Sequence, residues 1–258
     1  MLLEDKNAVI YGGGGAIGGA VARAFAREGA RVFLTGRTLA TLDEVAEGIH
    51  SSGGLAETAE VDALDETSVD SHADTVAQKA GGIDVSFNAI SIRDVQLIPL
   101  LEMSREDFMS PILTGTATHF LTARAAARHM AGQGSGVILT LSSSAISAFV
   151  PGVHIGGFGI SCTAIEALTK QLAAEFGPQG IRAVCLRPEG IPETWESIST
   201  DDWSGPPTEI EARIKARSLL GRVTTLADVG NAAVFLASDL AGATTGTVFN
   251  LTSGTVVD

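Results

Sequence analysis

The chain has 258 residues, of which 45% are hydrophobic, and it carries a formal net charge of −13 at pH 7. This length is sufficient for one large α/β domain, and no change in composition marks a second, so we expect a single domain over residues 1–258. The acidic balance argues against nucleic acid and anionic membranes as partners, because both bind basic surfaces.

The cysteines, histidines and apolar runs of the chain limit the setting in which it works. Only two cysteines occur, Cys162 and Cys185, and charged residues at positions 4–6 interrupt the apolar N-terminus. We therefore expect no secretory signal, a reducing environment and a cytoplasmic location. No apolar run reaches the roughly eighteen residues of a membrane span. The five histidines lack the paired spacing H-E-x-x-H, so no metal site is expected.

The first 37 residues predict a strand, a glycine-rich loop, a helix and a second strand. An apolar run over residues 8–11 leads into glycines at 12–15, 18 and 19, and an apolar stripe then continues to Gly29. Glycines permit backbone conformations that a Cβ forbids, and they let a pyrophosphate approach the N–H groups at a helix N-terminus. The stretch therefore predicts a nucleotide site.

Beyond residue 37, hydrophobic periodicity predicts a regular alternation of strands and helices. Strands are expected near residues 56–61, 83–87, 136–141, 181–186 and 247–251. Helices are expected near residues 38–50, 66–80, 106–130, 158–176 and 225–238, the last opened by a capping box of Thr225 and Asp228. With right-handed crossovers, this order predicts a doubly wound parallel sheet of about seven strands, with helices on both faces.

Residues 187–220 interrupt this alternation. The segment is rich in Pro, Glu, Ser and Thr, and it contains both tryptophans, Trp195 and Trp203. Ligands of such sheets bind beyond the carboxyl ends of the strands, which is where this segment begins, so we expect a substrate lid. The alternative is a solvated loop with a short helix. Together with the apolar loop over residues 148–157, the tryptophans suit a partly hydrophobic small molecule.

Several short motifs follow one another along nearly the whole chain. Residues 11–18 read Tyr-Gly-Gly-Gly-Gly-Ala-Ile-Gly, residues 88–90 read Asn-Ala-Ile, and residues 187–191 read Arg-Pro-Glu-Gly-Ile. These motifs, together with residues 235–239, resemble those of the short-chain dehydrogenase/reductase family, whose glycine motif is T-G-x-x-x-G-I-G. The chain departs from that motif at Tyr11, in its first place, and at Ala16, in the place of its middle glycine.

The resemblance implies cofactor contacts at Gly12, Gly14, Gly15, Ile17, Asp62, Ala63, Asn88, Ala89, Pro188 and Ile191. The glycine loop would hold the pyrophosphate, Asp62 the adenine, and Asn88 with Ala89 the ribose side. At the end of the second strand, a cofactor with a free 2′-hydroxyl prefers a carboxylate, yet this chain has Gly36 and Arg37. A guanidinium matches a 2′-phosphate, so NADP(H) is favoured over NAD(H); the alternative is an ordinary surface arginine.

The same resemblance indicates that the usual catalytic residues are absent. The family uses Asn, Ser, Tyr and Lys, with the tyrosine transferring a proton and the lysine lowering its pKa. Alignment of the helix after residue 157 places Phe158 at the tyrosine and Cys162 at the lysine. Gly115 or Thr114 stands at the asparagine, and Ser143 remains as the serine, with Ser144 beside it. A phenyl ring transfers no proton and a neutral thiol carries no charge, so the standard mechanism is excluded.

The residues near these positions leave alternatives open. Cys162 is either a nucleophile or a small apolar core residue. His154 is either a substitute acid or a loop histidine without a role. Glu189 replaces the first glycine of the Pro-Gly loop and puts a carboxylate near the expected nicotinamide, for which the sequence offers no explanation.

Three functions are compatible with this sequence. The first is an NADP(H)-dependent oxidoreductase that acts on a carbonyl or enone by a non-standard proton route. The second is a non-redox biosynthetic catalyst, such as a cyclase or dehydratase, and the third is an inactive cofactor-binding protein. The resemblance also implies self-association, and alanines on two helices (Ala123, Ala125, Ala126, Ala127, Ala164 and Ala167) would permit close packing between subunits in a homotetramer or homodimer. Their alternative use is packing within one chain.

Overall fold

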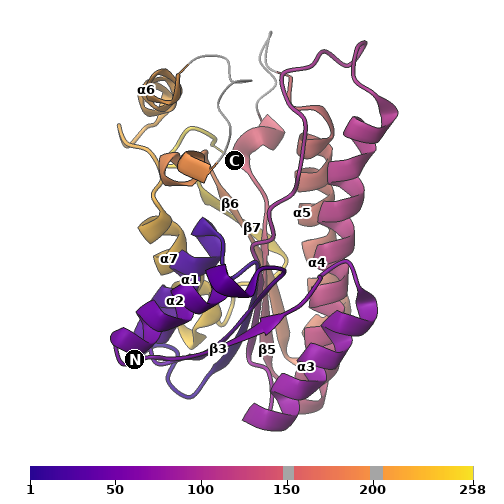
Figure 1. Cartoon of the computed structure of the whole chain (residues 1–258), viewed down its shortest axis with the longest axis vertical. Coiled ribbons are helices and arrows are strands. Elements are labelled where there is room, and N and C mark those ends of the chain that lie inside the picture. The colour runs from indigo at the N-terminus through magenta and orange to yellow at the C-terminus, as the bar shows by residue number, and fades with distance from the viewer. Residues whose placement is uncertain (148–153, 198–205, 258) are drawn as a thin grey trace.

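The structure is a computed structural model that describes residues 1–147, 154–197 and 206–257. At its centre lies one parallel sheet with the order β3-β2-β1-β4-β5-β6-β7 (Figure 1). The strands are β1 (Asn7–Tyr11), β2 (Arg31–Gly36), β3 (Leu55–Glu60), β4 (Val85–Asn88), β5 (Gly136–Leu141), β6 (Ile181–Pro188) and β7 (Thr247–Leu251). The helices are α1 (Ala16–Arg27), α2 (Leu39–Ser51), α3 (Glu66–Ala80), α4 (Arg105–Gln133), α5 (Gly156–Phe176), α6 (Pro207–Arg217) and α7 (Leu226–Ala237). The predicted doubly wound fold is confirmed.

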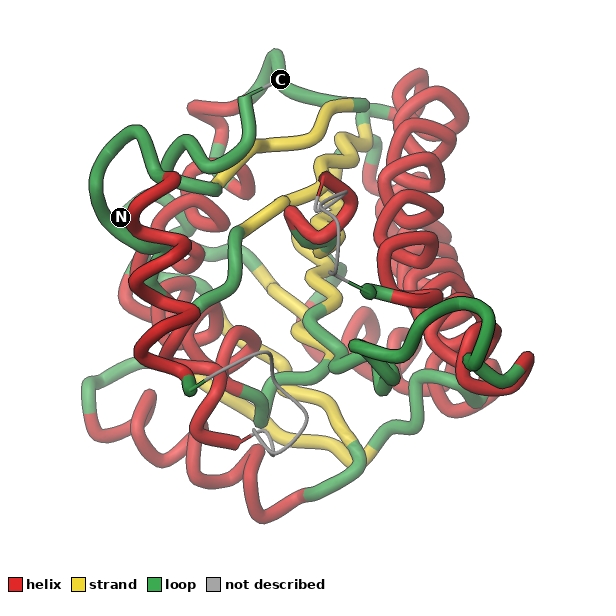
Figure 2. The backbone as a smooth tube through the Cα atoms, turned by 90° about the horizontal axis from the view of Figure 1, so that it is seen from above, coloured by secondary structure: helices red, strands yellow, loops and turns green. Residues whose placement is uncertain are grey.

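Helices cover both faces of the sheet, as its nearly continuous apolar strands require. In β1, Ala8 and Ile10 pack with α1, α2 and α7, whereas Val9 and Tyr11 pack with α3, α4 and α5. These two layers stand to the left and right of the sheet in Figure 1, and Figure 2 shows them on either side of the strands seen end-on. The ring of Tyr11, the only tyrosine, is therefore in the core, and burial raises the pKa of its hydroxyl.

The strand order reverses between β1 and β4. From β1 the chain adds β2 and β3 on one side, then returns to place β4 on the other side of β1. Tyr11 pairs with Asn88 at the carboxyl end of this pair, so the loops that begin at Gly12 and Ala89 leave the sheet side by side. Ligands of open α/β sheets bind at this kind of reversal.

Most of the predicted elements are confirmed, and the differences have local causes. The capping box of Thr225 and Asp228 opens α7 as predicted. Strand β2 runs as far as Gly36, because Thr35 and Gly36 pair with β3. Likewise, β6 extends beyond 181–186, because residues 187 and 188 pair with β7. Pro111 lies inside α4, which continues through it.

The alanines of α4 do not form a free face. Ala123, Ala125, Ala126 and Ala127 are all buried within the chain, where they pack against the sheet and α5. The intrachain alternative therefore holds for these four residues. Large apolar side chains exposed on these helices are Leu113 and Phe120 of α4 and Ile160 of α5.

The predicted lid segment lies only partly within the described residues. Its first two residues belong to β6; a short 3₁₀ helix (Pro192–Ser197) and α6 follow, while Trp203 and the adjoining stretch lie outside them. Trp195 packs on Gly190, where a Cβ would lie 3.3 Å from the indole, and Glu193 accepts a hydrogen bond from Leu226 N–H of α7. The described residues 190–195 thus lie close to the carboxyl end of β6. In the described parts of the chain, no helix is both long and apolar enough to cross a membrane.

Candidate active site

The glycine loop after β1 is packed too closely for any side chain at two of its positions. Gly12 has φ +76°, and a Cβ there would lie 2.6 Å from the carbonyl oxygen of Ala89. A Cβ on Gly18 would lie 2.1 Å from the carbonyl oxygen of Gly12. Both are below any normal contact distance, so the loop, α1 and the end of β4 pack directly on one another through their backbones.

Among the described residues, no side chain caps the N-terminus of α1. Gly15 is its N-cap, makes no side-chain cap, and no acidic residue occurs in the first turn. Three helices, α3, α4 and α7, are in contrast capped by Asp65, Ser104 and Thr225. A Cβ on Gly15 would meet only one atom, at 3.4 Å, so the backbone is accessible here. Free N–H groups at the positive end of a helix form an anion site, so this arrangement fits a pyrophosphate.

A second uncapped helix N-terminus lies beside the loop, at the start of α2. Its N-cap Thr38 makes no side-chain cap and its first turn holds no acidic residue. A Cβ on Gly14 would lie 2.4 Å from Oγ1 of Thr41, so this turn packs directly on the glycine loop. Arg37 is exposed immediately before it, and Asp43 accepts a hydrogen bond from Thr58 at 2.7 Å. Arg37 and the helix end together provide positive charge for a second anion.

The other predicted cofactor positions line the same edge of the sheet. Asp62, after β3, is exposed and accepts a hydrogen bond from the N–H of Leu64 at 3.0 Å, and Ala63 beside it is buried. Asn88 is buried, donating to Thr122 Oγ1 at 3.1 Å and accepting from Ile90 N–H at 3.0 Å.

At three further predicted cofactor positions, the main chain is better placed than the side chain to contact a cofactor. The side chain of Ile17 packs against the core, so its contribution to an anion site would be its N–H. Pro188, the last residue of β6, and Ile191, three residues later, are buried. A cofactor at this edge would therefore meet mostly main-chain groups.

The structure brings two of the three predicted catalytic residues close together. The backbone of Ser143 lies close enough to Cys162 to lower the pKa of the thiol, against the larger opposite effect of burial, and the hydroxyl oxygen of Ser143 accepts from Ala145 N–H at 3.2 Å. Phe158 stands in the first turn of α5, one turn before Cys162. Cys162 is 1% exposed, and this burial raises its pKa to about 12. The thiol is therefore neutral at pH 7 and is no ready nucleophile.

A buried ion pair lies behind these residues. Glu166 of α5 accepts two hydrogen bonds from Arg187, from Nε at 2.8 Å and from Nη2 at 2.9 Å. The hydroxyl of Ser142 donates to the same carboxylate at 2.8 Å. Glu166 and Arg187 are each 7% exposed, so the two charges compensate one another within the core.

Glu189 forms a second carboxylate centre at the same edge. Its Oε1 accepts from Ser144 Oγ at 2.6 Å and from Gly190 N–H at 3.0 Å, and its Oε2 accepts from Thr255 Oγ1. The side chain thus joins the loop after β5, the loop after β6 and the segment after β7. His154 precedes α5 and is half-buried; its carbonyl oxygen accepts from Leu97 N–H at 2.7 Å.

Comparison with known proteins agrees with this geometry. A family model described as enoyl-(acyl carrier protein) reductase matches residues 14–255. L-rhamnose 1-dehydrogenase (NAD(P)+) of Azotobacter vinelandii is 33% identical over 265 residues, covering 100% of this chain and 99% of that protein. The chain belongs to the short-chain dehydrogenase/reductase family.

Other relatives of this short-chain dehydrogenase/reductase also match it over nearly their whole length. The 7α-hydroxysteroid dehydrogenase of Clostridium sardiniense is 30% identical, covering 98% of this chain and 94% of that one. A solved 7α-hydroxysteroid dehydrogenase complexed with NADH and 7-oxoglycochenodeoxycholic acid superposes with a TM-score of 0.87 at 27% identity, covering 99% of this chain and 96% of that one. Membership places the chain in a family of oxidoreductases.

Gly115, one of the two residues predicted to stand at the family's asparagine, has no room for a side chain. A Cβ on Gly115 would lie 2.2 Å from Ser161 Oγ and 2.9 Å from Ile92 Cδ1. Gly115 therefore permits the close approach of α4 and α5, and it is Gly115, rather than Thr114, that faces α5. The Ser161 hydroxyl is buried and has no hydrogen-bond partner among the described residues.

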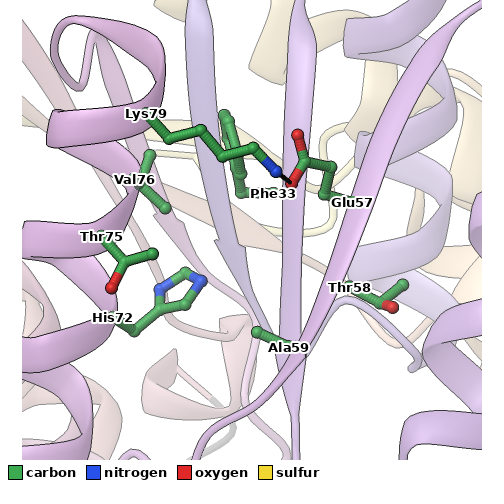
Figure 3. A pocket seen from close by; sticks show the side chains of 8 residues that line it. All are labelled: Phe33, Glu57, Thr58, Ala59, His72, Thr75, Val76 and Lys79. Carbon is green, nitrogen blue, oxygen red and sulfur yellow. Dashed lines mark hydrogen bonds and ion pairs between the residues drawn. The ribbon is translucent and has the colours of Figure 1, made fainter.

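A cavity of about 120 Å³ lies away from these positions, between the strands β2 and β3 and the helix α3 (Figure 3). It is lined by Phe33, Glu57, Thr58, Ala59, His72, Thr75, Val76 and Lys79. The ion pair of Glu57 with Lys79 crosses one end, and burial lowers the pKa of His72 to about 4. The cavity contains none of the predicted site residues.

Sequence reasoning missed the partners of the two carboxylates. Glu166 is a charged residue in an otherwise apolar helical stripe, and this signal could have marked it as a buried, paired group. Glu189 stands out in the sequence by its position, but its partners Ser144 and Thr255 come from other loops and have no sequence signal.

Proposed function

We propose that this protein is an NADP(H)-dependent oxidoreductase that reduces a carbonyl or enone of a small, partly hydrophobic molecule. The observation that carries the proposal is the uncapped N-terminus of α1 above a glycine loop that has no room for side chains. Backbone N–H groups near Gly15 and Ile17 would hold the pyrophosphate, and residues 62–63, 88–89 and 188–191 would line the remaining length. When bound, the nicotinamide supplies or accepts a hydride.

The preference for the phosphorylated cofactor rests on charge. The exposed guanidinium of Arg37 and the uncapped first turn of α2 both favour an anion, and Asp43 of the same helix is turned toward Thr58. A 2′-phosphate would gain hydrogen bonds from both groups, whereas a 2′-hydroxyl would find no carboxylate acceptor at Arg37.

Neither Phe158 nor Cys162 can transfer the proton in the proposed reaction. The oxygen of Ser143 accepts a backbone N–H, which leaves its own proton free to donate to a substrate oxygen. Ser143 would polarise the carbonyl, and the proton would arrive from water or from His154. The substrate would lie under the segment of residues 187–220, where Trp195 supplies apolar surface.

One observation favours a second candidate, a non-redox catalyst or an inactive cofactor-binding protein. Phenylalanine, a neutral buried thiol and a glycine without space occupy the three altered positions of the family's tetrad. An active site with these residues could still orient a substrate for cyclisation or dehydration. Self-association as a homotetramer or homodimer is a separate proposal, tested by light scattering.

The deciding experiment is calorimetric titration with NADPH and NADH, followed by assays of NADPH oxidation against a panel of carbonyls and enones. Binding with consumption of NADPH supports the oxidoreductase. Binding without consumption supports a cofactor-binding protein, and product formation with unchanged NADPH supports the non-redox catalyst. The double variant Phe158→Tyr, Cys162→Lys should gain ordinary carbonyl reduction if the rest of the site is intact.

A further inference from the structure

Glu189 stands where the family's Pro-Gly loop has a glycine, and its carboxylate is fixed in place. Donors from three separate segments hold it: Ser144 Oγ at 2.6 Å, Gly190 N–H at 3.0 Å, and Thr255 Oγ1. Both oxygens are engaged, so the side chain has little freedom to turn away from the sheet edge. Three donors on two oxygens suit an ionised carboxylate, which only accepts hydrogen bonds.

Among the described residues, the groups that hold Glu189 are neutral donors rather than cations. Arg187, two residues earlier, is committed to Glu166 in a bidentate pair. Position 162, where the family has a lysine, holds a thiol that burial keeps neutral. Asp94 is close enough for its charge to raise the pKa of that thiol, and so adds to the negative potential. The site is thus negative where the family resemblance implies the positive charge of a lysine.

We infer that Glu189 makes this site bind oxidised NADP+ more tightly than reduced NADPH. The inference rests on the proposed function. The nicotinamide ring is positively charged when oxidised and neutral when reduced, so a fixed carboxylate beside it stabilises only the oxidised form. Pro188, directly before Glu189, and Ile191, two residues after it, are assigned to the cofactor by the family resemblance. Glu189 thereby determines which redox form of the cofactor the site prefers.

This preference has a direction for catalysis. A site that favours the oxidised form makes the reduced form a stronger hydride donor, since transfer of the hydride creates the charge that Glu189 stabilises. The protein would then act as a reductase rather than as a dehydrogenase. The acceptor gains the hydride at carbon, and its oxygen takes the proton supplied through Ser143.

The test needs no substrate. The dissociation constants of NADP+ and NADPH are measured by calorimetry for the native protein and for Glu189→Gln, which keeps an acceptor oxygen for Ser144 but removes the charge. We expect the native protein to bind NADP+ more tightly, and the variant to lose about tenfold of that preference, as for charges several ångströms apart at a partly solvated site. Glu189→Asp should keep most of the preference.

Glu175→Gln provides a matched control, because it changes the net charge equally on an exposed residue near the end of α5. Its ratio of dissociation constants should equal that of the native protein. Tighter binding of NADPH than of NADP+ by the native protein would overturn the inference, even if the Glu189→Gln variant failed to fold. Equal losses in Glu189→Gln and Glu189→Asp would also overturn it, since charge would not be the cause. Binding of neither form would instead refute the proposed function.

Discussion

The two ends of the ligand-binding edge differ in what supports them. On the side of β1 and β2, the cradle is built from backbone: glycines without space for a Cβ and helix ends without side-chain caps. On the side of β5 and β6, the predicted catalytic positions depend on side chains, and the chain has Phe158, Cys162 and Gly115 where the family resemblance implies tyrosine, lysine and asparagine. Backbone geometry withstands substitution elsewhere in the chain, whereas catalytic chemistry depends on individual side chains.

This difference separates binding from turnover. The backbone side keeps what a dinucleotide requires, so cofactor binding is expected whatever happens at the other side. The side-chain side holds a neutral thiol, Cys162, and two fixed carboxylates, Glu166 and Glu189. Substitutions on the β1–β2 side should therefore weaken cofactor binding, whereas substitutions on the β5–β6 side should alter turnover.

The largest effect is expected in the reactivity of Cys162. Its pKa is raised to about 12 by burial, so below that pH almost no thiolate is present, and the rate of alkylation should rise as the pH approaches 12. In a Cys185→Ser background at pH 8, we expect alkylation about a thousandfold slower than in the urea-unfolded protein. The rate is followed by mass spectrometry. Reaction at the rate of a free thiol would restore a nucleophilic role for this residue.

The next largest effect concerns the backbone cradle. Gly12→Ala should weaken NADPH binding about a hundredfold, because the residue has φ +76° and its Cβ would lie 2.6 Å from the Ala89 oxygen. Titration calorimetry measures this loss. Gly53→Ala is the matched control, since Gly53 has φ +82° but a Cβ there would meet nothing within 4 Å, and it should bind NADPH normally. Equal affinities for the two variants would argue against the cradle.

A smaller effect is expected at Arg37. Arg37→Asp should weaken NADPH binding by about ten- to a hundredfold and leave NADH binding unchanged or stronger, because one charge-assisted contact to the 2′-phosphate is lost. Arg105→Asp, the same charge change on an exposed residue at the start of α4, is the control. Unchanged NADPH affinity in Arg37→Asp would remove the assignment of NADP(H).

The smallest effect is one of stability. Gly115→Ala should destabilise the protein by about 1–3 kcal/mol, because its Cβ would lie 2.2 Å from Ser161 Oγ. Ser161→Ala alone should be nearly neutral, since that buried hydroxyl has no partner among the described residues. Urea unfolding of the two single variants and the double variant gives the coupling between them. Purely additive losses would show that α4 and α5 do not meet at this point.

The fold could be predicted because its signals are local. Short apolar runs predicted the strands, and the capping box at Thr225 predicted the start of α7. The glycine cluster after the first strand likewise predicted a loop at that position, because its signal lies within a few consecutive residues. The carboxylate contacts could not be predicted, since Glu166 and Arg187 lie 21 residues apart and Glu189 and Thr255 lie 66 apart. The lack of space at Gly115 arises from the close approach of α4 and α5. The sequence of neither helix alone indicates how closely they approach.

The bond between Glu189 and Thr255 has a practical consequence for handling the protein. It ties the final segment of the chain to the edge where the cofactor would bind. An affinity tag fused after residue 258 would begin close to this bond, and could pull Thr255 from the carboxylate. Met1, in contrast, lies beside Gly29, between α1 and β2 and away from that edge (Figure 1). Purification tags and surface-immobilisation handles for binding measurements therefore belong on the N-terminus.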